Sequence, residues 1–386
     1  MFRPLPPWPE MYLYVGLIAF AISTCLMPVA IVLLRRFDVM DRVTNGKIHR
    51  RSTPRGGGIV IFIAFAIAVM LPDYRDNPMK GVLVGSFICL FVGMLDDIKG
   101  GVPAVLKFAA LMTATLVMSY FGVRLNLFGN YALDLAVTML WIVGVTSAFN
   151  GIDNMDGLAS GVAVIVSTMY LAIALLSFYA VGTETSLSWF GLLAAGLIGS
   201  NLGFLIYNFK PARVFMGDSG SFFLGFTLSA LGVMGEWSES RIIASTIPIL
   251  ILGVPVFDFA YILLVRIFKG ETRTLRDVIE HCAPDHLSHR LVWIGFSQRN
   301  AVLFIYMISF VLGISGVLLR NSTSASDSVL GLLQAASVLC IVVILMAVAG
   351  RLHQQATQDP EIALAKRVDL ELLEDAEETE DVKKSA

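Results

Sequence analysis

Charged residues are scarce in this sequence. Only 15% of its 386 residues are Asp, Glu, Lys or Arg, and 56% are hydrophobic, whereas about 25% of an ordinary soluble domain is charged. This composition excludes a soluble globular protein and predicts one that is embedded in a membrane. The formal net charge of −2 says little by itself, and no nucleic-acid partner is expected for a membrane protein of this kind.

Cysteine and long polar segments are also scarce. The four cysteines (Cys25, Cys89, Cys282 and Cys340) fall within expected helices or on the expected cytoplasmic side, which excludes a disulfide framework. The sequence shows no internal repeat and no separate soluble domain. We expect one membrane domain over residues 1–350, followed over 351–386 by an acidic cytoplasmic tail that stays solvated and disordered.

Long apolar runs make up most of the chain. A helix that crosses a bilayer needs roughly 20 mostly apolar residues, and eleven runs are candidates, although the second and fifth are short. The sequence therefore predicts an all-α polytopic membrane protein with about eleven transmembrane helices. These expected helices cover residues 11–34, 57–72, 79–95, 103–121, 134–148, 158–181, 188–207, 219–235, 241–265, 299–319 and 328–350.

The basic residues predict the orientation, because short cytoplasmic loops are enriched in Lys and Arg. With the N-terminus outside and the C-terminus in the cytoplasm, only six of the 28 Lys and Arg residues lie outside. The reverse topology would translocate the basic cluster in residues 35–55. The chain should therefore be a multi-pass protein with its longer loops in the cytoplasm.

The ionisable residues suited to chemistry gather in these cytoplasmic loops. A charged side chain at the bilayer centre costs at least about 3 kcal/mol, so carboxylates at helix ends indicate a water-filled cleft. We expect an active site at this membrane boundary. The loops concerned cover residues 35–56, 96–103, 149–157, 208–218 and 266–298.

Asp96 and Asp97 directly follow the third apolar run. Adjacent carboxylates repel one another unless a metal ion, a basic residue or a phosphate-bound cation shares their site. The pair therefore suggests a magnesium or phosphate role. The alternative is a pair of solvated residues that marks a helix end.

Asn150, Asp153 and Asp156 recur at a spacing of three, before Gly157. If this segment continues into the sixth helix, the three side chains lie along one face, and hard oxygen ligands of this kind suit magnesium bound together with substrate phosphates. The alternative is an Asx-rich turn between two helices.

Asn208, Phe215 and Asp218 occupy the next cytoplasmic loop. Asp218 offers a third carboxylate, and the glycines and serines around it leave backbone amides free for an anion at the start of the eighth helix. Phe215 could stack on a base. Capping of that helix by Asp218 is compatible with such a site.

Two basic regions complete the set. The first loop contains Lys47 and the run Thr53-Pro54-Arg55-Gly56-Gly57-Gly58, and Lys107 opens the fourth helix. Topogenic charge and anionic headgroups explain the basic residues, but glycines before a helix suggest that phosphate approaches there. In the last long loop, His286, His289 and Arg290 suit phosphate or sugar oxygens better than structural zinc, because no zinc-type spacing is complete.

Four of these motifs, in this order, resemble the polyprenyl-phosphate N-acetylhexosamine-1-phosphate transferases over residues 45–295. The histidine segment His286-Leu287-Ser288-His289 looks like the His-x-His-His pattern of the bacterial undecaprenyl-phosphate N-acetylglucosaminyl-1-phosphate transferases, with its middle histidine replaced by Ser288. The motifs are Thr53-Pro54-Arg55-Gly56-Gly57, Asp96-Asp97, Asn150-x-x-Asp153-x-x-Asp156-Gly157, and Asn208 followed by Phe215-Met216-Gly217-Asp218.

The resemblance implies a Mg²⁺-dependent transferase, with Mn²⁺ able to substitute, in the bacterial inner membrane. It would move N-acetylglucosamine-1-phosphate from a UDP-sugar to undecaprenyl phosphate, release UMP and start a lipid-linked glycan such as O-antigen or exopolysaccharide. The family also suggests a homodimer. The implied catalytic residues are Asp96, Asp97, Asp153, Asp156 and Asp218, with metal on Asp218 and Asp97; the implied substrate ligands are Lys47, Lys107, Asn150, Asn208, Phe215, His286, His289 and Arg290.

Two alternatives stay open at this point. A phospho-N-acetylmuramoyl-pentapeptide transferase would share most of the motifs but carries three consecutive histidines. A secondary transporter would place its carboxylates near the bilayer midplane and often show inverted repeats. This sequence lacks three consecutive histidines. The carboxylates singled out in it lie at helix ends, and it shows no repeat.

Overall fold

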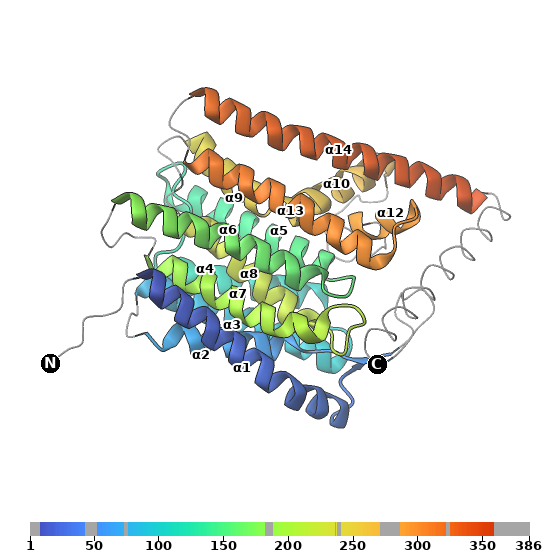
Figure 1. Ribbon diagram of the computed structural model, residues 1–386, viewed down its shortest axis with the longest axis horizontal. Coiled ribbons are helices and arrows are strands. Elements are labelled where there is room, and N and C mark those ends of the chain that lie inside the picture. The colour runs from blue at the N-terminus through green and yellow to red at the C-terminus, as the bar shows by residue number, and fades with distance from the viewer. Residues whose placement is uncertain are drawn as a thin grey trace.

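The computed structural model describes residues 8–42, 52–72, 76–181, 188–235, 237, 241–270, 286–321 and 325–358. Its helices lie side by side in one bundle, with neighbours running in alternating directions (Figure 1). They are α1 (Trp8–Arg36), α2 (Gly58–Met70), α3 (Asn77–Lys99), α4 (Ala104–Tyr120), α5 (Tyr131–Ile152), α6 (Leu158–Val181), α7 (Ser188–Asn208), α8 (Gly217–Met234), α9 (Arg241–Ile251), α10 (Gly253–Lys269), α12 (Leu287–Trp293), α13 (Gln298–Arg320) and α14 (Ala325–Gln358).

Every apolar run predicted from the sequence is helical, which confirms an all-helical polytopic protein. Within the described residues, seven helices are long and apolar enough to cross a membrane, or eight if a bent pair counts as one span, and α2 and α4 are shorter apolar helices. The number of eleven spans and the orientation of the termini stay predictions.

The expected single helix over residues 241–265 is wrong, because the chain breaks there into α9 and α10 at an angle of 91°. Leu252 leaves the helical conformation, with φ −89° and ψ 22°, four residues after Pro248, which has no N–H to donate. Hydrophobicity alone could not reveal this bend, since both halves are apolar.

Helix α8 forms the centre of the bundle. All its residues from Ser219 to Val233 are buried, and it packs against α3 and α5 on either side. The hydroxyls of Ser86 and Thr227 are 2.8 Å apart and join α3 to α8. Because protein rather than lipid surrounds α8, it can carry more polar residues than a lipid-facing helix.

Small residues bring α1 and α7 into close contact. Ser23 donates its hydroxyl to the carbonyl of Ser200 at 2.7 Å, and a side-chain carbon on Gly199 would lie 2.0 Å from the carbonyl oxygen of Gly16. Close backbone approach at small residues is a common way for membrane helices to associate.

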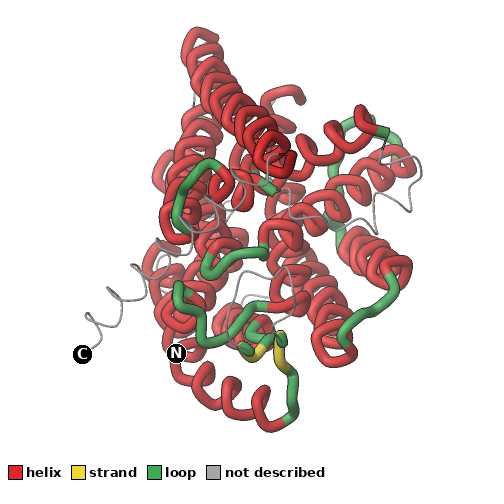
Figure 2. Tube along the Cα trace, turned by 90° about the vertical axis from the view of Figure 1, so that its right-hand side faces the viewer, coloured by secondary structure: helices red, strands yellow, loops and turns green. Residues whose placement is uncertain are grey.

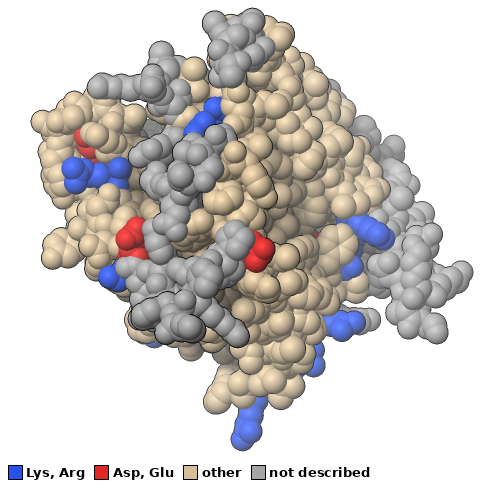
Figure 3. All heavy atoms as spheres, turned by 60° about the vertical axis from the view of Figure 1, so that its left-hand side comes forward, with Lys and Arg blue, Asp and Glu red and all other residues tan. Residues whose placement is uncertain are grey.

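The flanks of the bundle are apolar. Only 17% of the membrane-crossing window of α1 and 22% of that of α14 is buried, and their exposed side chains include Leu17, Val32 and Ile344. Lys, Arg, Asp and Glu are correspondingly sparse on the face that Figure 3 shows. Such a surface suits lipid contact.

A small sheet, which the sequence analysis did not predict, lies in the connection between α1 and α2 at one end of the bundle. β1 (Met40–Asp41) pairs antiparallel with β2 (Thr53–Pro54), and the next residue, Arg55, forms a parallel bridge with Phe215. Figure 2 looks onto this end, where the two strands lie among the loops. The bridge between Arg55 and Phe215 therefore fixes the first basic loop against the segment that leads into α8.

The contact between α1 and α7 yields a stability prediction. Gly199→Ala should lower the free energy of unfolding by about 1–3 kcal/mol, because the added carbon meets backbone that cannot turn aside. Thermal unfolding in detergent measures the effect.

The matched control is Gly144→Ala in α5, where a side-chain carbon meets nothing within 4 Å. This variant should be as stable as the parent protein or slightly more so, because alanine favours a helix. Equal stability of Gly199→Ala and the control would contradict the tight packing.

Candidate active site

Most of the residues singled out in the sequence lie at one end of the bundle. The C-terminal ends of α3, α5 and α7 and the N-terminal ends of α4, α6 and α8 meet there, together with β2 and α12. In Figure 1 this is the right-hand end, and Figure 2 views it directly. The alternating directions of the helices therefore bring five separate loops to one place.

Asp96, Asp97 and Asp218 form a carboxylate cluster at this end. Each offers one oxygen, and these oxygens lie within 4.8 Å of one another. Asp96 and Asp97 are buried, and Asp218 is half-buried. Gly93 permits the approach, because a side-chain carbon there would lie 2.3 Å from the backbone oxygen of Asp218. The pairing predicted across two loops is therefore present.

Two cations lie against the cluster. The Nζ of Lys107 is 2.6 Å from Oδ2 of Asp218 and 2.8 Å from Oδ1 of Asp96. The Nη2 of Arg55 is 2.7 Å from Oδ1 of Asp97 and 3.3 Å from Oδ2 of Asp96. Burial would lower the pKa of Arg55, but the carboxylates of Asp97, Asp218 and Asp96 together outweigh burial and raise it. Three carboxylates are thus paired with two cations.

Asp97 caps α8 from a different helix. Its carboxylate accepts the backbone N–H of Asp218 at 2.9 Å and of Ser219 at 3.1 Å, as well as two N–H groups of Arg55 at 2.9 and 2.7 Å. A carboxylate has about four lone-pair sites, and this one is 1% exposed. The geometry therefore gives Asp97 an anchoring role, and its expected role as a metal ligand stays a prediction.

The carboxylates of Asp96 and Asp218 accept fewer backbone hydrogen bonds than that of Asp97. Asp96 accepts the backbone N–H of Val102 at 2.6 Å in addition to its ion pairs. Asp218 accepts from Nδ2 of Asn150 at 3.3 Å, and the same amide group donates to Ser221 at 2.8 Å. The structure therefore places Asn150 and Lys107, both expected as substrate ligands, at the cluster.

Residues 150–157 do not form a continuous helix, so the expectation that Asn150, Asp153 and Asp156 share one helical face is wrong. α5 ends at Ile152 and α6 begins at Leu158, because the intervening segment is a turn in which Gly157 has a φ of 77°. Burial, followed by the charges of Asp218 and Asp97, raises the pKa of Asp153 to about 8. Asp153 therefore lies within the field of the cluster.

Asp156 and Asn208 hold loops together. Asp156 accepts the backbone N–H of Ala212 at 3.0 Å. The buried amide of Asn208 accepts from Gly157 N and Ser160 Oγ at 3.1 and 3.0 Å and donates to Val214 O at 2.9 Å. Asn208 is therefore engaged inside the protein and is not brought to the cluster.

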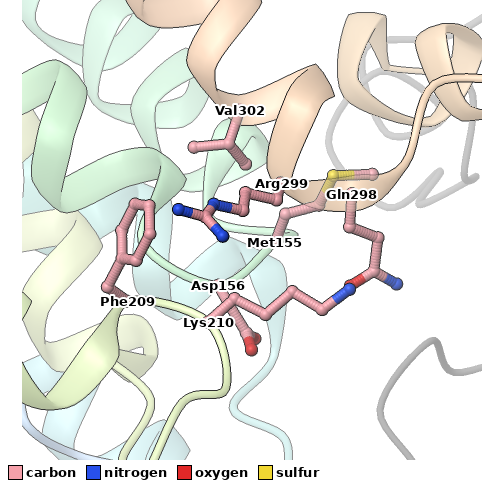
Figure 4. Close-up of a pocket in the computed structure, with 7 residues that line it drawn as sticks. All are labelled: Met155, Asp156, Phe209, Lys210, Gln298, Arg299 and Val302. Carbon is pink, nitrogen blue, oxygen red and sulfur yellow. The ribbon is translucent and has the colours of Figure 1, made fainter. Parts of the chain in front are cut away.

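A shallow depression adjoins Asp156. In Figure 4, Lys210 and Asp156 lie on one side of it and Arg299 and Val302 of α13 on the other. Met155, Phe209 and Gln298 complete its lining, which includes none of the three clustered carboxylates. The reaction chemistry therefore does not belong in this depression.

Phe215 contributes its backbone to the fold of the site. Its N–H donates to Pro54 O at 2.8 Å, and its carbonyl accepts from Gly57 N at 3.0 Å. Phe215 is half-buried, and the stacking of its ring on a base stays a prediction. Lys47 lies outside the described residues.

The histidine segment docks on the 150–157 turn. His286 directly precedes α12, and a side-chain carbon on Gly151 would lie 2.8 Å from Cε1 of its ring. Ser288 donates to Oδ1 of Asn154 at 2.6 Å. The ring of His286 therefore lies against the last turn of α5, while His289 is half-buried on α12.

Arg290 faces away from the cluster. It is buried, donates from Nη1 to Met346 O at 2.9 Å, and lies over the rings of Tyr261 and Trp293. These contacts join α12 to α14 and α10. The expected role of Arg290 as a substrate ligand is not supported by this position.

The sequence analysis missed Asp258, which is 1% exposed in α10. Its Oδ2 is 2.7 Å from Nδ1 of His286, and its Oδ1 accepts Leu287 N–H at 2.8 Å. The available signal was a lone carboxylate inside an apolar run, since such residues are costly in a membrane and commonly functional.

The chain is similar to known transferases. A model described as glycosyl transferase family 4 matches residues 79–236. The chain is 35% identical over 322 residues (79% of this chain, 85% of the relative) to the probable undecaprenyl-phosphate N-acetylglucosaminyl 1-phosphate transferase of Bacillus subtilis (strain 168). It is 30% identical over 327 residues (76% and 78%) to the decaprenyl-phosphate N-acetylglucosaminephosphotransferase of Mycolicibacterium smegmatis (strain ATCC 700084 / mc(2)155).

A second kind of relative is also similar. The chain is 29% identical over 324 residues to the phospho-N-acetylmuramoyl-pentapeptide-transferase of Clostridium botulinum (strain Eklund 17B / Type B), which covers 78% of this chain and 94% of the relative. Both kinds of relative are named as transferases of a phosphorylated sugar.

The anchoring role of Asp97 predicts a loss of stability. Asp97→Ala should lower the free energy of unfolding by roughly 3–5 kcal/mol, because breaking a buried ion pair leaves its partner uncompensated. Two N–H groups of α8 also lose their acceptor. Thermal unfolding in detergent measures the change.

Asp38→Ala is the matched control, because Asp38 pairs with Arg42 at the surface, where it is 67% exposed. Such pairs contribute about 0–1 kcal/mol. An Asp97→Ala protein that is as stable as this control would show that the cluster does not hold α8 in place.

Proposed function

The chain belongs to glycosyl transferase family 4, and from this we propose that it transfers N-acetylglucosamine-1-phosphate from a UDP-sugar to undecaprenyl phosphate. The products are UMP and a lipid-linked pyrophosphate sugar that starts a cell-envelope glycan. The observation that carries the proposal is the cluster of Asp96, Asp97 and Asp218 with Lys107 and Arg55, at the end of a bundle whose flanks are apolar. A lipid phosphate can reach such a site while its chain stays in the bilayer.

The bond changes are simple. An oxygen of the lipid phosphate attacks the phosphorus that carries the sugar, and the bond from that phosphorus to UMP breaks. The attacking group is already anionic, because the second pKa of a phosphate monoester is about 6. Catalysis therefore rests on charge neutralisation and in-line alignment of two anions, which suits a site with Lys107 and Arg55.

Mg²⁺ fits the donor set, because carboxylate oxygens are the hard ligands that it prefers. Asp218 would hold it together with Asp96, while Asp97 remains the anchor of α8. The bound ion would neutralise charge on the diphosphate. Mn²⁺ accepts the same oxygen ligands and could substitute.

Lys107 has a second task in this proposal. Its ammonium group lies between Asp96 and Asp218, so it competes with a divalent cation for the same oxygens. When it withdraws, a substrate phosphate can accept its hydrogen bonds, and every charge stays paired. Asn150 remains on Asp218.

The setting of the reaction follows from its substrates. A nucleotide sugar is made in the cytoplasm and undecaprenyl phosphate is confined to the bilayer, so we place the site at the cytoplasmic face of the bacterial inner membrane. This agrees with the orientation expected from the basic residues.

The second candidate function is transfer of phospho-N-acetylmuramoyl-pentapeptide, which the 29% identical relative favours. The histidine segment argues against it, because that class carries three consecutive histidines there. In this chain the segment instead contains Ser288, which is buried against Asn154. The two functions differ only in the donor sugar.

The decisive experiment measures UMP release by the purified protein in detergent, with undecaprenyl phosphate, Mg²⁺ and a panel of UDP-N-acetylhexosamines and UDP-muramyl-pentapeptide. Release that requires both lipid and metal, with UDP-N-acetylglucosamine as the preferred donor, is the expected result. Release with the muramyl donor alone would favour the second function, and no release by a folded protein with any donor would overturn both.

Asp218 gives a direct prediction. Asp218→Asn should lower UMP release at least about 100-fold, because it removes a charge that binds metal where charge develops in the transition state. Its folding should be retained, since the amide keeps an acceptor. Activity and thermal unfolding are measured on the same sample.

Asp134→Asn serves as the control, because Asp134 is a buried carboxylate at the opposite end of α5 that caps a turn through Leu127 N and Phe128 N. Its activity should match that of the parent. If Asp218→Asn also stayed within a few-fold of the parent, Asp218 could not be a metal ligand.

A further inference from the structure

We propose that Asp258 is a positioning residue, which holds the Nδ1 proton of His286 and thereby presents Nε2 to the active site. The inference rests on the proposed function, because it assigns His286 to the substrate. It extends that function to a residue in the middle of α10, outside every motif singled out in the sequence.

The contacts of Asp258 are directional. Oδ2 lies 2.7 Å from Nδ1 of His286, and Oδ1 lies 2.8 Å from the backbone N of Leu287. A carboxylate is acceptor-only when ionised, and a backbone N–H can only donate. Both neighbours of an ionised Asp258 must therefore donate, which would hold the proton of His286 on Nδ1.

The position of the ring then determines what Nε2 can do. The two ring nitrogens point in diverging directions, so Nε2 is directed away from α10 when Nδ1 faces Asp258. The Cε1–Nε2 edge lies against Gly151, next to Asn150 on the cluster and two residues before Asp153. Nε2 is left to accept a proton or, once protonated, to donate to a phosphate oxygen.

The burial of Asp258 supports a specific use. Its side chain is 2% exposed, and that of His286 is 19% exposed. A carboxylate inside a membrane bundle is costly unless it is paired, and both partners of this one belong to the histidine segment. Carboxylate partners that orient metal-bound histidines commonly affect activity 10- to 100-fold, and we expect an effect of similar size for His286.

The substitution Asp258→Asn tests the tautomer while keeping the shape of the side chain. Asn has one acceptor and one donor group, and Leu287 N–H requires the acceptor. The amide NH₂ then faces Nδ1 of His286, which must become an acceptor, so the proton moves to Nε2. We expect a loss of UMP release of about 10- to 100-fold, with Asp134→Asn as the control at parent activity.

A double-mutant cycle with His286→Gln separates positioning from general support of the fold. Gln keeps a donor toward Asp258 but has no ring nitrogen to protonate. If Asp258 acts through His286, Asp258→Asn should change the activity of His286→Gln by less than about three-fold. An equal loss in both backgrounds would overturn the inference.

Nitrogen NMR gives a readout that does not depend on activity. The chain has five histidines, and the resonances of His286 are those missing from ¹⁵N-histidine-labelled His286→Gln. We expect protonated Nδ1 in the parent and protonated Nε2 with bare Nδ1 in Asp258→Asn. Identical spectra would overturn the inference, whereas a parent protein without UMP release would overturn the proposed function alone.

Discussion

The site depends on the contact between the Asp97 carboxylate and the first turn of α8. Through it one residue of α3 binds two backbone N–H groups of α8 and the guanidinium of Arg55, which lie 121 or more and 42 residues away along the chain. Only glycine fits at position 217. Its φ is 75°, and a side-chain carbon there would lie 2.5 Å from Asp97 Oδ2. Asp218 reaches the cluster because Asp97 holds the backbone N–H of Asp218 itself and that of the next residue, Ser219.

Charge balance explains why this arrangement lies at the end of the bundle. Burying carboxylates is costly unless each has a partner, and here two cations from two other segments supply the partners. One further positive charge completes the balance around Asp96, Asp97 and Asp218. Under the proposed function, a divalent cation bound with a diphosphate would bring both the missing charge and an anion for Lys107, so that no charge would be left unpaired.

The helices and the grouping of the carboxylates could be predicted from the sequence. The directions of the individual side chains could not, for a physical reason. Apolar runs and loop carboxylates depend on composition, so the helices and the Asp96–Asp97–Asp218 grouping were predictable. Composition does not determine the direction in which a side chain points. Asp96 and Asp97 are adjacent, but neighbouring residues of a helix point about 100° apart, so one meets Lys107 and the other meets α8. Arg290 is turned toward Met346 for a similar reason.

The same distinction applies to long-range pairs. Asp258 and His286 are 28 residues apart, on either side of residues 271–285, and only the bend between α9 and α10 sends α10 toward the histidine segment. Pro248 and Gly253 indicate that a helix can break there but not in which direction. In the inference drawn above, the carboxylate of Asp258 in α10 determines which nitrogen of His286 carries its proton. A helix inside the bundle would then set the protonation and direction of a reactive group in the segment before α12.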